Sequence, residues 1–200
     1  FNNIYYFKTP HYSWKVTIMK ASVYIATSLD GFISRPNGSV DWLPGGESET
    51  GEDYGYHAFM SSVDALVMGR NTYEMVLSFG EWPYGDKPVI VLSSRNLELP
   101  DNLIKTVSQM GGRPKEIVAQ LTAQGYQHVY IDGGLTIQGF IREGLIQEII
   151  VTQIPILIGE GLPLFGSIPE DIPLELLESL PFENGFVQNK YQIQENKHLA

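Results

Sequence analysis

Glycine, hydroxyl and arginine side chains directly follow three apolar runs of this chain, VDALVM, PVIVL and VYID. These residues are Gly69, Arg70, Asn71, Thr72, Ser93, Ser94, Arg95, Gly133, Gly134, Leu135 and Thr136. The backbone N–H groups at the start of a helix attract anions, and a guanidinium group can bind phosphate through two hydrogen bonds. If each run is a strand followed by a turn or helix, the three segments predict a site for a ligand with several phosphates.

The two most familiar phosphate-binding fingerprints are absent. No G-x-G-x-x-G segment opens a helix, and no G-x-x-x-x-G-K-[ST] segment occurs. The chain is therefore neither a typical Rossmann protein nor a P-loop NTPase. A dinucleotide bound by a different fold remains as the expected ligand.

An open parallel sheet would bring the three segments together, because ligands bind beyond the carboxyl ends of its strands. Apolar runs alternate with segments of helical spacing, which is typical of a mainly parallel sheet with crossover helices. The predicted strands are Ala21–Thr27, Ala65–Met68, Lys87–Leu92, Leu103–Val107, His128–Ile131 and Ile146–Ile158, the last broken at Pro155, and then a hairpin of Leu174–Leu180 and Gly185–Ile193. The predicted helices are Asp53–Ser62, a helix from Asn71–Thr72 with Thr72 as N-cap, Arg113–Gln124 and Gly134–Glu143.

No linker, repeat or low-complexity tract divides the chain, so we expect one α/β domain over residues 19–194. Residues 1–18 are aromatic and polar and lack the apolar core of a secretory signal. We expect them to be an extension before a natural start at Met19, and residues 195–200 to be a tail.

Charge and composition exclude several classes of function. The chain has 13 Lys and Arg against 23 Asp and Glu, with a net charge of −10 and no basic block, so nucleic acid is not the expected partner. No run approaches the ~18 apolar residues of a membrane helix. The absence of cysteine excludes disulfides and thiolate chemistry and fits a reducing cytoplasm, where we expect the protein. The four histidines show no metal-ligand spacing, and we predict no metal site.

The segments SLDGFI, DWLP, VDALVMGRNTYE, PVIVLSSR, VYIDGGLTIQGFI and GEGLPLF occur in this order. Together they resemble the dihydrofolate-reductase-like superfamily over about residues 20–193. The chain is most similar to the C-terminal reductase domain of the bifunctional riboflavin-biosynthesis deaminase/reductase and its stand-alone bacterial relatives. The resemblance implies a single α/β domain with a mostly parallel sheet of about eight strands, a C-terminal antiparallel hairpin and helices on both faces.

The resemblance also implies that NADPH is the cofactor. Ala26 would border the nicotinamide, and the segments from Gly69 to Thr72 and from Gly133 to Thr136 would hold the phosphates. Ser93, Ser94 and Arg95 would hold the adenosine 2′-phosphate. Independently, two arginines near one nucleotide favour NADPH over NADH, because NADPH carries an extra phosphate.

Hydride transfer to a C=N or C=O bond of a heterocyclic substrate is the activity that the resemblance implies. Asp53 matches the acid that grips the substrate, with a raised pKa if an apolar wall covers it, and Thr152 matches the hydroxyl that supports this acid. The alternative is that Asp53, with Glu52, only complements the start of a helix. The other expected substrate-binding residues are Asp30, Trp42, Tyr54, His57 and Asp132.

The residues expected around the substrate are acidic. Between residues 30 and 60 there are six acids, two of them in the apparent insertion GGESETG, against the single base Arg35. We therefore expect an unphosphorylated pyrimidine- or pterin-like substrate rather than a phosphoribosylated one. Two alternatives stay open: a true dihydrofolate reductase and a non-catalytic NADPH-binding module. We also expect a homodimer, because exposed sheet edges invite pairing.

Overall fold

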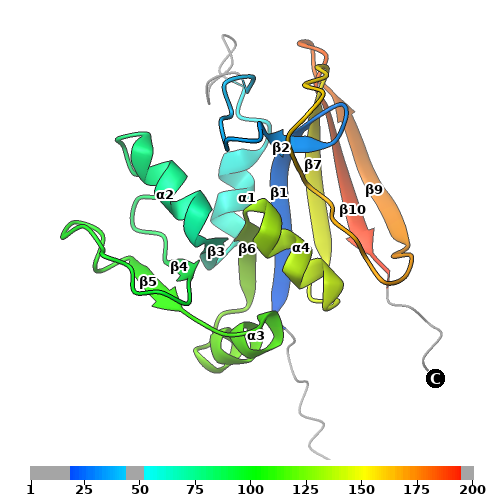
Figure 1. Ribbon diagram of the computed structural model, residues 1–200. Coiled ribbons are helices and arrows are strands. Elements are labelled where there is room, and N and C mark those ends of the chain that lie inside the picture. The colour runs from blue at the N-terminus through cyan, green and yellow to red at the C-terminus, as the bar shows by residue number, and fades with distance from the viewer. Residues whose placement is uncertain (1–18, 44–51, 195–200) are drawn as a thin grey trace, which may run out of the picture.

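A computed structural model describes residues 19–43 and 52–194 (Figure 1). Residues 1–18, 44–51 and 195–200, and with them the whole apparent insertion GGESETG, lie outside the described residues. An eight-stranded sheet runs in the order β5-β4-β3-β6-β1-β7-β10-β9, parallel from β5 to β7 and antiparallel beyond it. The strands are β1 Lys20–Ser28, β3 Ala65–Gly69, β4 Val89–Leu92, β5 Val107–Met110, β6 His128–Asp132, β7 Glu148–Ile154, β9 Leu174–Pro181 and β10 Val187–Ile193. The predicted fold class is confirmed.

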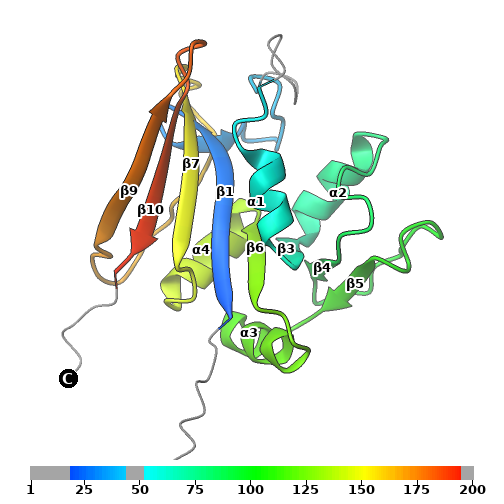
Figure 2. The same cartoon turned by 180° about the vertical axis from the view of Figure 1, so that it is seen from behind.

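Helices cover both faces of the sheet (Figures 1 and 2). One face packs against α1 (Tyr56–Ser62) and α2 (Arg70–Ser78) through a core that includes Phe59 and Tyr73. The other packs against α3 (Pro114–Ala123) and α4 (Gly134–Arg142) through a second core that includes Ile117 and Phe140. Among the described residues, no helix has the length and apolar character needed to cross a bilayer.

Three predicted elements differ from the structure for local reasons. The strand predicted at Leu103–Val107 is wrong, because residues 103–106 form turns in which Leu103 O accepts from both Thr106 N and Val107 N, and β5 only then begins. α1 starts at Tyr56 and not at Asp53, since Tyr54 and Gly55 both have positive φ, 55° and 83°. β7 starts at Glu148, two residues after the predicted start, and ends at Ile154, so the break predicted at Pro155, which has no N–H to pair, is confirmed.

The structure also contains a small second sheet that the sequence did not predict. β2 (Phe32–Ser34) pairs with β8 (Leu162–Pro163), and together they bring the loop after β1 to the start of α4. A Cβ at Gly134 would lie 2.8 Å from Ile33 Cδ1, so glycine is needed where the two segments meet.

The sheet splits between β1 and β6. These strands pair only from Lys20 opposite His128 to Ser22 opposite Tyr130, whereas β1 continues beside β7 as far as Ser28. Beyond the last pair, the Tyr130 hydroxyl donates to Tyr24 O at 2.7 Å. The carboxyl ends of β1 and β6 are therefore free of each other, which is the kind of position where open α/β sheets bind ligands.

Candidate active site

The three segments singled out in the sequence lie at neighbouring strand ends. Gly69 at the end of β3 is opposite Leu92 at the end of β4, and Met68 of β3 is opposite Asp132 at the end of β6. The turn after each of these strands thus begins at the same edge of the sheet, next to the β1–β6 split. This convergence of the three strand ends follows from the order of the strands in the sheet. The sequence alone does not give that order, so it supported the convergence only as an expectation.

The turns after β3 and β6 interlock. A Cβ at Gly133 would collide with Thr72 Oγ1, and one at Gly69 would lie 2.9 Å from Thr136 Oγ1. These two glycines are the N-caps of α4 and α2, and neither helix has a side-chain cap hydrogen bond. The prediction that Thr72 is an N-cap is wrong. Two adjacent helix starts with uncapped N–H groups fit a pyrophosphate, because each attracts negative charge.

The two arginines follow neighbouring strands, Arg70 directly after β3 and Arg95 three residues after β4. Arg70 begins α2, and its Nε donates to Glu74 Oε1 at 2.6 Å, an ion pair that leaves the terminal guanidinium nitrogens for a phosphate. After β4, Ser93 Oγ donates to Arg95 O at 2.6 Å and accepts from Arg95 N at 3.2 Å. Gln109 Nε2 of β5 donates to the carbonyl oxygens of Ser93 and Arg95 at 3.0 and 2.9 Å. Gln109, which sequence reasoning missed, therefore fixes the turn that carries Arg95.

Asp53 lies just before α1, and both of its carboxylate oxygens accept hydrogen bonds. Its carboxylate accepts from Gly55 N at 2.9 Å, from His57 N at 2.9 Å and from His57 Nδ1 at 2.6 Å. The backbone N–H groups of His57 and Gly55, followed by the His57 ring, lower the pKa of Asp53. The expected raised pKa is wrong, and the contacts agree with the alternative in which Asp53 complements the start of a helix. The His57 side chain is 82% exposed.

Three of the expected site residues gather in one apolar cluster. Ala26, Trp42 and Tyr54 pack with Ile154 and Phe186. Thr152 lies opposite Ala26 in the β1–β7 pairing and accepts a hydrogen bond from Gln188, a residue of β10 that the sequence did not single out. Asp30 lies on the loop after β1 and accepts from the N–H groups of Ile158 and Gly159 at 3.3 and 2.8 Å, so it ties this loop to the one after β7.

Asp132 is the most perturbed carboxyl group of the site. It accepts from Gly133 N at 2.7 Å, and burial raises its pKa to about 6 against the opposing effects of Gly133 and Tyr130. Tyr56 and Tyr84 also lie close enough for the Asp132 charge to add to the burial that raises their pKa values, that of Tyr56 to about 12. Tyr84 comes from the segment between α2 and β4, which contains no motif. A carboxyl whose pKa lies this close to neutral can accept or donate a proton near the working pH of an enzyme.

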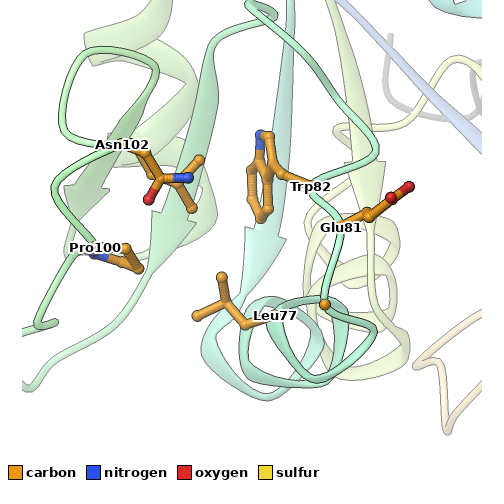
Figure 3. Close-up of a pocket in the computed structure, with 7 residues that line it drawn as sticks. Leu77, Glu81, Trp82, Pro100 and Asn102 are labelled. Atoms are coloured by element: carbon orange, nitrogen blue, oxygen red, sulfur yellow. The ribbon is translucent and has the colours of Figure 1, made fainter.

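A cavity of about 310 Å³ lies apart from these residues, at the C-terminal end of α2. Leu77, Trp82, Pro100 and Asn102 border it, while the carboxylate of Glu81 points away (Figure 3). None of its lining residues was predicted to bind cofactor or substrate. The candidate site is therefore defined by the strand ends and not by this cavity.

The sheet order, the helices on both faces and the C-terminal antiparallel strands define a dihydrofolate-reductase-like α/β fold. A dihydrofolate reductase from Enterococcus faecalis, solved in complex with NADP(H), matches with a TM-score of 0.61 and 22% identity. The match covers 90% of this chain and 98% of that one, and it concerns the fold alone.

The chain belongs to the RibD C-terminal domain family, whose family model matches residues 20–188. The uncharacterized protein YwjB of Bacillus subtilis (strain 168) is 35% identical over 159 residues, 78% of this chain and 88% of that protein. A putative riboflavin biosynthesis protein from Shewanella sp. PV-4 has a structure with a TM-score of 0.83 and 43% identity, covering 88% of this chain and 100% of that one. The predicted resemblance is confirmed, and the fold and family are those of RibD-type reductases.

Proposed function

We propose that this protein is an NADPH-dependent reductase that transfers hydride to an unphosphorylated pyrimidine- or pterin-like heterocycle. The observation that carries the proposal is the interlocked pair of uncapped helix starts, α2 and α4, beside the split between β1 and β6. Membership of the RibD C-terminal domain family makes reduction the expected class of activity.

The residues at the strand ends fit the parts of NADPH. The N–H groups at the starts of α2 and α4 would hold the pyrophosphate, and Arg70 and the Ser93–Arg95 turn would hold the phosphates of the adenosine half. When bound, the cofactor supplies the hydride. This chain contributes alignment at Ala26 and the β1–β6 split, and Asp132, with a pKa raised to about 6, can exchange a proton just below neutral pH.

The double variant Arg70→Ala, Arg95→Ala tests the cofactor assignment. Calorimetry should show NADPH affinity reduced at least about a hundredfold, because each charged hydrogen-bonding group contributes roughly 1.5–3 kcal/mol. NADH affinity should fall less, since NADH lacks the 2′-phosphate. Arg142→Ala, at the C-terminal end of α4, is the matched control and should bind NADPH like the parent. Equal NADPH affinities of the double variant and the parent would refute the assignment.

The preference for a substrate without phosphate rests on charge. Arg35, the single base between residues 30 and 60, donates from Nε to Asp41 Oδ1 at 2.7 Å and is thus neutralised. We expect kcat/KM for 5-amino-6-(5-phosphoribosylamino)uracil to lie below about 10⁴ M⁻¹s⁻¹, the lower end of the common range, and to rise when the phosphate is removed. Assays of NADPH oxidation with the phosphorylated compound, its dephosphorylated form and dihydrofolate make this comparison. An ordinary kcat/KM with the phosphorylated compound would show the charge argument wrong.

Two further parts of the proposal concern the setting of the enzyme. We propose a homodimer formed through the edge strand β9, whose eight residues are all exposed. We also propose that the protein works in the cytoplasm, on the observation that its sequence has no cysteine.

A further inference from the structure

The turn before α1 has an unfavourable backbone conformation. Within the described residues, Tyr54 is the only residue other than glycine with positive φ, 55°, and the next residue, Gly55, is also left-handed. A left-handed conformation costs a non-glycine residue roughly 1–2 kcal/mol. Such a conformation persists only where the surroundings hold it, so the contacts of Tyr54 show what holds this turn.

Gln188 of β10 reaches the backbone of this turn, and Asn184, between β9 and β10, donates from Nδ2 to the Tyr54 hydroxyl at 2.7 Å. Gln188 Nε2 lies 3.0 Å from Tyr54 O, 3.1 Å from Tyr24 Oη and 3.0 Å from Thr152 Oγ1. Tyr24 Oη donates to the same Tyr54 O at 2.6 Å. A carbonyl oxygen only accepts, and a glutamine amide nitrogen has two hydrogens to donate, so the amide nitrogen and not its oxygen must face the turn.

These contacts fix one particular peptide group. The carbonyl oxygen of the Tyr54–Gly55 peptide accepts from Gln188 and Tyr24, and its N–H donates to Asp53 Oδ1 at 2.9 Å. The other carboxylate oxygen, Asp53 Oδ2, accepts from the backbone N–H and the ring Nδ1 of His57. One planar peptide therefore connects the amide of Gln188 to the carboxylate of Asp53 and, through it, to the His57 ring.

We infer that Gln188 is a positioning residue: it holds the Tyr54–Gly55 peptide and thereby sets the direction of the Asp53–His57 pair at the substrate side of the site. This inference rests on the proposed function for its effect on catalysis. It also explains the placement of Thr152, which reaches the Asp53 turn only by accepting from Gln188. A residue of β10 thus acts on the start of α1.

Gln188→Met tests the inference, because methionine keeps the length of the side chain and removes both donors. Gln192→Met, on the same strand and the same face, is the matched control. Carbon-13 NMR should show the pKa of the Asp53 carboxyl rising toward its ordinary value in Gln188→Met and staying unchanged in Gln192→Met. The other titratable groups around Asp53, namely Glu52, His57 and Tyr24, are followed in the same spectra.

Catalysis supplies the second readout. With the dephosphorylated aminouracil as substrate, Gln188→Met should lower kcat/KM about tenfold, the effect of one to two lost hydrogen bonds, and should shift the acid limb of its pH profile. NADPH affinity should stay within about twofold of the parent. If Gln188→Met folds poorly, Gln188→Glu replaces it: its acceptor faces the Tyr54 carbonyl, so its activity should fall further as pH rises.

The two readouts keep this inference separate from the function on which it rests. If the parent oxidises NADPH with no compound tested, the proposed function fails, and the Asp53 titration still decides the role of Gln188. If Gln188→Met leaves the Asp53 titration and the Gly55 and His57 amide shifts as in the parent, Gln188 does not position this turn and the inference is overturned.

Discussion

At the scale of single residues, ionised Asp132 is expected to lower the stability of the folded protein. Its carboxyl follows β6, accepts from Gly133 N, and has a pKa raised to about 6 mainly by burial. Ionising such a group in the folded protein costs free energy that an amide would not. Residues kept against stability occur chiefly at functional sites, which supports a role for Asp132 with substrate.

Asp132→Asn should therefore stabilise the protein in a pH-dependent way. The folded-state pKa lies above the ordinary value of 3.8, so the favourable effect of protonating Asp132 is complete below pH 4 and is lost as pH rises through 6. Two pKa units correspond to roughly 3 kcal/mol, and partial exposure reduces the expected gain to on the order of 1–2 kcal/mol. Denaturation should show this gain at pH 8 and none at pH 4. A gain of equal size at both pH values would contradict the burial of a charge.

At the same scale, the residues that could be predicted from the sequence differ from those that could not. Gly69 and Gly133 stand directly after apolar runs, so their place at strand ends follows from local pattern alone. Gln109 and Gln188 act through neighbouring strands, and ordinary strand sequences contain no sign of which carbonyl their amides will meet. Contacts of this kind depend on register, which a single sequence does not state.

Among the elements, those with long apolar runs could be predicted and those held by turns could not. The strands of the central sheet were expected because they are buried on both faces, whereas β2 and β8 have three and two residues and form only because the loops after β1 and β7 meet. The start of α1 was misplaced for a related reason: Tyr54 adopts a conformation that its own residue type disfavours. The hydrophobic pattern of a segment therefore predicts strands and helices that the segment's own residues favour, and it misses those that depend on contacts with distant loops.

The interlocked turns after β3 and β6 allow a test at the scale of elements. Gly133→Ala should destabilise the protein by more than about 2 kcal/mol and abolish NADPH binding, because the new Cβ would collide with Thr72 Oγ1 and φ is +88°. Gly125→Ala is the matched control: its φ is +93° but nothing lies within 4 Å, so only the roughly 1–2 kcal/mol of backbone strain is expected. Chemical denaturation and calorimetry measure both effects. Equal destabilisation by the two variants would mean that the two turns do not need this close approach.

For the whole molecule, the eight-stranded sheet ends in an edge that natural proteins rarely leave open. β9 is the last strand, all of its residues are exposed, and four of them are leucines exposed by 40–54%. It contains none of the lysines with which edge strands usually prevent pairing. In the proposed dimer, antiparallel pairing centred on Leu177 would place Leu174 opposite Leu180, Leu177 opposite its own copy and neither glutamate opposite another.

Leu177→Lys should therefore convert a dimer into a monomer. Leu177 is 47% exposed on β9, and a lysine there would lie opposite the same lysine of the second copy, so that two like charges would meet in the centre of the paired edge. Sedimentation at micromolar concentration should give a dimer for the parent and for Ile104→Lys, an exposed position in the turn before β5. Since the chain has no cysteine, Leu177→Cys should also form an intermolecular disulfide if the two strands meet around this residue. A parent protein that sediments as a monomer throughout would exclude this interface, and a dimer that survives Leu177→Lys would place it elsewhere on the surface.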